Sequence, residues 1–64
     1  MKIQRIDIID ETTVIANTYE SEASANAGAA PLSSETLELE GDVESFLTSR
    51  GFVLGDFSWQ KSAE

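Results

Sequence analysis

Residues 42–59 read DVESFLTSRGFVLGDFSW, and this stretch carries the clearest local structure signal in the chain. Asp42 is a good helix N-cap because its carboxylate can accept hydrogen bonds from the free amides of a first turn. Val43, Phe46 and Leu47 come next at i, i+3 and i+4 spacing, which places them on one helix face. The stretch therefore predicts a helix of about two turns, too short to be stable unless that face is packed.

The second half of the stretch predicts the end of this helix and a strand after it. Gly51 suits the left-handed position that terminates many helices. Residues 52–59 are rich in aromatic and β-branched side chains, which favours a strand, and Gly55 indicates a bulge or a close approach within it. Residues 60–64 are expected to form a tail. We expect most of the aromatic side chains to lie in the core, namely Tyr19, Phe52, Phe57 and Trp59.

Upstream of the helix the sequence predicts a β-hairpin and a further strand. Residues 3–10 and 13–19 are β-branched and alternate at strand period, and the polar turn between them is short enough for an antiparallel pair. Leu37 and Leu39 alternate with glutamates, the pattern of a half-buried strand. A single helix over residues 34–50 is the alternative, but it would leave Leu37 outside its apolar stripe and include Gly41 at a cost of about 1 kcal/mol.

Residues 20–34 differ from the rest of the chain because they are small, polar and without large apolar anchors. We expect a flexible loop or a frayed helical turn there. The predicted fold class is α+β, a single domain over residues 1–64. Its elements have the order β-β-loop-β-α-β, and one short helix packs on one face of a small, mainly antiparallel sheet.

Length and composition limit the functions that the chain can carry. A chain of 64 residues buries only about 60% of its unfolded surface, so association would help to stabilise it. There is no cysteine and no histidine, which removes the thiolate ligands of metals and the commonest general base. We therefore expect no enzymatic activity, no cofactor and no dedicated metal site. Neither a membrane-spanning stretch nor a signal peptide is evident, so the cytoplasm is the expected location.

The distribution of charge points to a kind of partner. The net charge is −8, and between Arg5 and Arg50 there are ten acidic residues and no basic one. Binding to nucleic acid needs lysine or arginine to displace counterions, so direct contact with DNA or RNA is not expected. A basic protein surface is the natural electrostatic partner.

The candidate partner-binding residues are a run of acids and one tryptophan. If residues 36–40 form a strand, Glu38 and Glu40 project from one face about 6.6 Å apart, spaced so that they could imitate phosphates. Trp59 is added because tryptophan is enriched at binding hot spots, although a structural position in the core is the favoured explanation of this residue. An ordinary solvated surface, weak cation binding and adaptation to high salt are the alternative explanations of the acids. The candidate set is Glu35, Glu38, Glu40, Asp42, Glu44 and Trp59.

These observations favour a small acidic module that binds a basic, nucleic-acid-handling protein and inhibits or modulates it. In size and charge the chain resembles inhibitors of host defence encoded by viruses and phages, including anti-CRISPR proteins. That resemblance is one of size and charge alone, while the row of carboxylates suggests nucleic-acid mimicry as one route to protein binding. The alternative is a structural or accessory subunit that is stable as a homo-oligomer.

Overall fold

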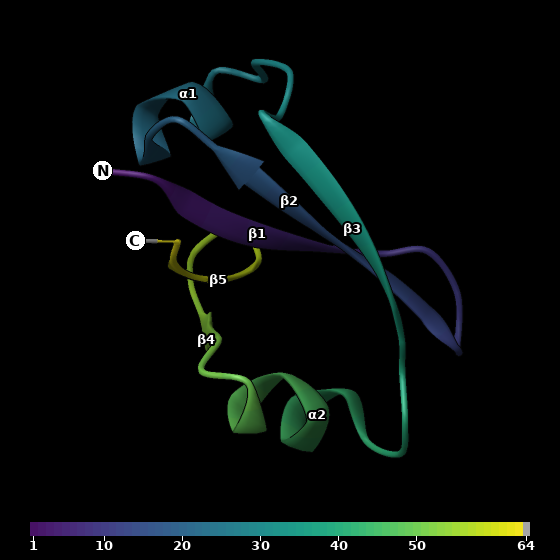
Figure 1. Cartoon of the computed structure of the whole chain (residues 1–64). Helices are drawn as coiled ribbons and strands as arrows, with labels where there is room; N and C mark the ends of the chain where they lie inside the picture. The colour runs from purple at the N-terminus through teal and green to yellow at the C-terminus, as the bar shows by residue number, and fades with distance from the viewer. Residues whose placement is uncertain (64) are drawn as a thin grey trace.

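A computed structural model of the chain describes residues 1–63. Five strands form one sheet in the order β3-β2-β1-β5-β4, and every neighbouring pair is antiparallel (Figure 1). The α+β class and the antiparallel sheet are therefore confirmed, but the described residues form two short helices instead of one. The elements in chain order are β1 (Ile3–Ile8), β2 (Thr13–Tyr19), α1 (Glu22–Asn26), β3 (Ser33–Glu38), α2 (Val43–Ser49), β4 (Val53–Leu54) and β5 (Trp59–Ser62).

The predicted hairpin is confirmed as β1 and β2. Ile6 lies opposite Ala16 and Ile8 lies opposite Val14, so the apolar side chains of both strands project from the same face of the sheet. Asp10 shapes the turn between the strands, because its Oδ1 accepts a hydrogen bond from the Thr12 amide at 2.8 Å.

The strand predicted around Leu37 is also confirmed, and the long-helix alternative is wrong. β3 pairs with β2, placing Leu37 opposite Val14. The strand begins at Ser33 and ends at Glu38, so it starts earlier and stops sooner than the alternation alone indicated. Gly41 has a φ of +72°, a conformation that a right-handed helix through this point could not contain.

The segment over residues 20–34, predicted as a flexible loop or a frayed helical turn, contains the five-residue helix α1 and the start of β3. Ser21 caps α1 by accepting a hydrogen bond from the Ser24 amide at 3.1 Å, and the alanines beyond it favour helix. No residue of α1 is buried, which agrees with the absence of large apolar side chains in the sequence. Ser33 and Ser34 belong to β3.

The predicted strand over residues 52–59 is two strands joined by a turn, so that prediction was wrong. The Gly55 amide donates to the Ser58 carbonyl at 3.0 Å, which reverses the chain between β4 and β5. The predicted tail is also wrong over residues 60–62, since these belong to β5 and pair with β1; residue 64 lies outside the described residues. The pairing supplies partners for β1 that are distant in sequence, which a local pattern cannot indicate.

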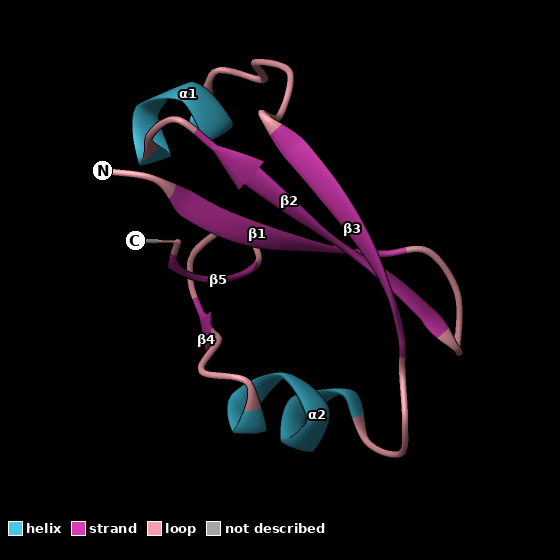
Figure 2. Ribbon diagram, in the orientation of Figure 1, coloured by secondary structure: helices cyan, strands magenta, loops and turns pink. Residues whose placement is uncertain are grey.

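The core residues come from the sheet, from α2 and from the segment that follows α2, so the core lies between the sheet and this helix. Figure 2 shows α2 apart from the strands, joined to them by loops at both ends. Leu47 is fully buried and Asp42 caps the helix, so the predicted apolar face and N-cap are confirmed. Phe57 was predicted in the core but is 74% exposed, because it lies in the turn between β4 and β5. The buried apolar residues are Ile6, Val14, Ala16, Leu47 and Phe52, and those packed partly against them are Leu37, Leu39, Val43, Phe46 and Trp59.

Candidate partner-binding site

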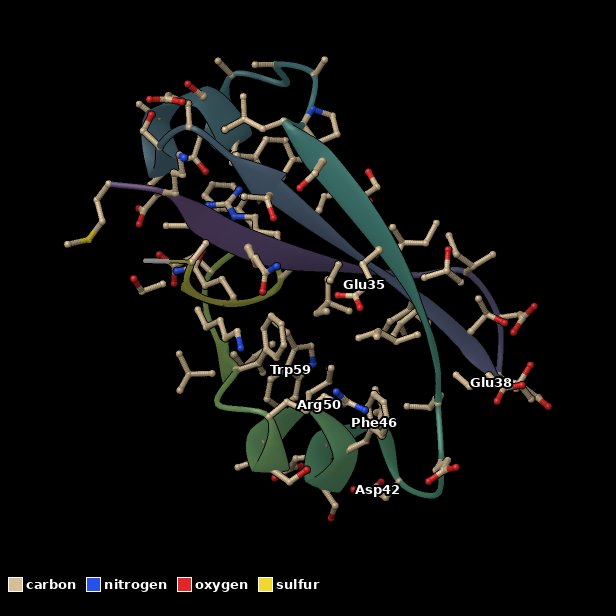
Figure 3. All side chains as sticks on the ribbon, in the orientation of Figure 1. Glu35, Glu38, Asp42, Phe46, Arg50 and Trp59 are labelled. Carbon is tan, nitrogen blue, oxygen red and sulfur yellow. The ribbon has the colours of Figure 1, made fainter. Side chains whose placement is uncertain are left out.

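The register of β3 assigns its side chains to two faces of the sheet. Glu35 lies opposite Ala16, and Leu37 lies opposite Val14, so both belong to the face that carries the core and α2. Glu38 lies opposite Thr13 and therefore belongs to the other face of the sheet. Figure 3 shows Glu35 directed toward the side of α2 and Glu38 directed away from it.

The predicted row of acids is therefore not one continuous ridge. Glu38 is the last residue of β3, so Glu40 lies in the connection to α2 and does not share a strand face with Glu38. All five acids of the candidate set are exposed. The structure distributes them along the β3 edge, the connection and the first turn of α2.

Asp42 and Glu44 act first on the helix. The Oδ2 atom of Asp42 accepts a hydrogen bond from the Ser45 amide at 3.0 Å, which satisfies one donor of the first turn. Glu44 lies in that turn, where its negative charge suits the helix dipole. Both carboxylates are exposed.

Two further acids lie beside this region and were not in the predicted site. The Leu39 amide donates to the Thr12 carbonyl at 2.8 Å, so the β1–β2 turn with Asp10 and Glu11 adjoins the end of β3. This placement follows from strand pairing. When a third strand pairs antiparallel with the second strand of a hairpin, the hairpin turn lies beside the C-terminal end of the third strand. Hydrogen bonds from Thr12, first from its amide and then from its hydroxyl, lower the pKa of Asp10.

Three of the four basic side chains lie over aromatic rings of the same chain. The Arg50 guanidinium is 4.5 Å from the Phe46 ring centre. Arg5 lies 5.4 Å from Phe57 and also donates from Nε to the Gln60 Oε1 at 3.1 Å. Lys61 Nζ lies 5.0 Å from the ring of Phe52 and donates to the Arg50 carbonyl at 3.2 Å.

Trp59 is placed apart from the acids of β3. It begins β5, pairs with Leu54 of β4, and packs partly buried against the core. Strands β1 and β2 lie between β5 and β3 in the sheet. The structure therefore does not bring Trp59 together with Glu38 or Glu40.

Side-chain hydrogen bonds centred on the buried Asn17 link β3 to the sheet on the face opposite the core. Asn17 is 7% exposed and sits in the middle of β2. Its Nδ2 donates to Asp7 Oδ2 at 2.6 Å, and its Oδ1 accepts from the Ser34 hydroxyl at 2.6 Å. The network links β1, β2 and β3 through side chains as well as through the backbone ladder.

Within residues 1–63 the structure contains no pocket and no group of three or more acidic side chains placed to hold a metal ion. None of the helices in this part of the chain has the length and apolar character needed to cross a membrane. No family model, curated protein or solved structure matches the chain.

Proposed function

We propose that the protein is a small acidic module that binds a basic surface of a nucleic-acid-handling protein and inhibits or modulates it. The observation that supports this proposal is the separation of charge within the fold. Arg5, Arg50 and Lys61 are held over aromatic rings, while the acids of β3, of the connection after it and of the α2 N-terminus are all exposed. A cationic surface of a partner would therefore meet carboxylates whose negative charge is little reduced by basic side chains of the same chain.

The hydrogen-bonded backbone on either side of these acids supports the proposal. β3 is held by its ladder to β2 and by the Asn17 network, and the α2 N-terminus is held by the Asp42 cap. Carboxylates on fixed elements lose little backbone entropy on binding, so more of their attraction remains as affinity. Mimicry of a phosphate row is one way in which such a module would occupy a nucleic-acid groove.

The proposal is tested by charge reversal with a matched control. Immobilised protein is incubated with a cell lysate at low salt, captured proteins are eluted along a salt gradient, and duplex DNA is added as competitor in a parallel sample. We expect capture of nucleic-acid-binding proteins that DNA prevents, and loss of that capture in the Glu38→Lys/Glu40→Lys variant. The Glu20→Lys/Asp56→Lys variant has the same net charge and should retain it. Equal loss in both variants, or no such proteins at low salt, would refute the proposal.

One observation favours a second candidate, a structural or accessory subunit that is stable as a homo-oligomer. Val53 and Leu54 on β4 are 63% and 67% exposed, and the neighbouring Phe57 is 74% exposed. Such side chains could be covered by another copy of the chain. Native mass at micromolar concentration decides this candidate, since a monomer would remove it.

A further inference from the structure

The strand β3 has a free edge that is long enough to accept another strand. Within residues 1–63 it is the outermost strand of the sheet on its side, and it pairs with β2 alone. It runs over six residues, and all of them except Leu37 are exposed. An edge of this length presents backbone donors and acceptors in the spacing that an extended peptide can match.

The register shows which backbone groups are available. Leu39 donates to the carbonyl of Thr12 in the same register that places Leu37 opposite Val14. Hydrogen-bonded positions alternate along an antiparallel pair, so residues 33, 35 and 37 direct their N–H and C=O groups toward β2. Residues 34, 36 and 38 consequently direct theirs outward, away from the sheet.

The two glutamates of β3 define the charge that fits this edge. Glu35 and Glu38 are three positions apart and therefore project from opposite faces of the strand. A strand added outside β3 would have one side chain beside each of them, again three positions apart. This spacing is the same whether the added strand runs parallel or antiparallel to β3.

We propose that the β3 edge binds an extended peptide segment that carries basic residues at positions i and i+3, which adds to the sheet as a sixth strand. The choice of a basic occupant rests on the proposed function. A second copy of the chain is a poorer occupant, because pairing through β3 would place two sets of Glu35 and Glu38, and two chains of net charge −8, against each other.

The test compares two peptides of identical composition with the full chain. Both are eight-residue peptides of threonine and valine with two lysines, at the third and sixth positions in one and at the third and fifth in the other. We expect the first to bind about fivefold more tightly by calorimetry, the equivalent of one cross-strand charge pair. Equal affinities would show attraction to net charge alone, and binding of neither peptide would also overturn the proposal.

Two proline variants separate edge pairing from simple charge attraction. Thr36→Pro removes an outward N–H, so it should leave the β2–β3 ladder intact and weaken peptide binding by more than about tenfold. Glu35→Pro removes an inward N–H and should instead lower the unfolding midpoint in urea. Undiminished binding to a folded Thr36→Pro protein would refute the inference.

The same variants distinguish this inference from the proposed function. Lysate capture that is lost in Glu38→Lys/Glu40→Lys but retained in Thr36→Pro would keep the acidic module and exclude the added strand. Self-association of the native chain that Thr36→Pro abolishes, seen by sedimentation velocity, would identify a second copy as the occupant and overturn the inference.

Discussion

The two edges of the sheet differ in length, charge and apolar character. The β3 edge runs over six residues and carries Glu35 and Glu38, with Leu37 only partly exposed. The β4 edge has two residues, Val53 and Leu54, and both side chains are mostly exposed. A long edge is protected from self-association by like charge, whereas a short edge can carry apolar side chains because it offers few backbone partners.

The two edges also differ in where the basic residues lie. Lys61 belongs to β5, which is the neighbour of β4. The Arg5 guanidinium lies over the ring of Phe57, in the turn between β4 and β5. No basic residue belongs to β3 or to its neighbour β2. One edge of the sheet therefore carries acidic side chains, and the other carries exposed apolar side chains.

The largest expected effect is on the free energy of unfolding, and it compares a substitution in the core with one at the β4 edge. Leu47 is fully buried and connects α2 to the sheet, so Leu47→Ala should lower the free energy of unfolding by about 2–5 kcal/mol. Leu54→Ala on the β4 edge should change it by less than about 0.5 kcal/mol. Urea unfolding measures both. Similar losses would mean that β4 packs more tightly than its exposure indicates.

The next effect concerns the connection from α2 to β4. Gly51 has a φ of +93°, and an added Cβ would meet only Lys61 Cδ at 3.9 Å, so the cost of Gly51→Ala comes from the backbone. We expect a loss of about 1–2 kcal/mol in the free energy of unfolding. Gly51→Asn should cost less, because asparagine tolerates this conformation better. Equal costs would point to a steric origin instead.

A slightly smaller effect is expected at the connection from β3 to α2. Asp42→Ala removes the acceptor for the Ser45 amide and should cost about 1 kcal/mol by thermal unfolding. Asp42→Ser keeps a capping oxygen and should be nearly as stable as the native chain. If the Asp42 charge contributes to the partner surface, Asp42→Ser should elute from captured partners at lower salt. An unchanged elution would confine Asp42 to its capping role.

The smallest effect is a pH dependence in the turn beside the β3 edge. Hydrogen bonds from Thr12 lower the pKa of Asp10 in the folded chain. Its contribution to stability is therefore complete above the ordinary carboxyl pKa of about 4 and is lost as the pH falls through the lower folded value. The native chain should lose its stability advantage over Asp10→Asn on going from pH 7 to pH 2 in urea titrations. If the difference in the free energy of unfolding between the two proteins stayed constant with pH, protonation of Asp10 would not be coupled to unfolding.

Local signals in the sequence predicted several elements correctly, and each has a short-range physical cause. The N-cap at Asp42, the apolar face through Leu47 and the left-handed glycine at Gly51 all involve residues within one or two turns of each other. The β1–β2 hairpin and the β3 strand follow from the alternation of apolar and polar residues, because one register places the apolar side chains of all three strands on the core face. The acids of the candidate site were proposed from the same local counting, and their role in binding stays a prediction.

The errors arose where distant segments meet. Residues 60–62 look like a tail because they are polar, but their backbone pairs with the edge of β1 that β2 does not occupy. Phe57 looks like a core residue by type, yet the turn between β4 and β5 places it outside. The acids were expected as one row, but the end of β3 at Glu38 divides them, and the adjoining hairpin turn adds Asp10 and Glu11.

By itself, the sequence determined the class of fold, the short capped helix and the excess of negative charge between Arg5 and Arg50, because caps, alternation and charge depend only on neighbouring residues. The tertiary structure alone decided the strand order, the free β3 edge and the faces on which Glu35 and Glu38 project. Strand order depends on which backbone groups find partners across long loops, a choice that no short stretch encodes.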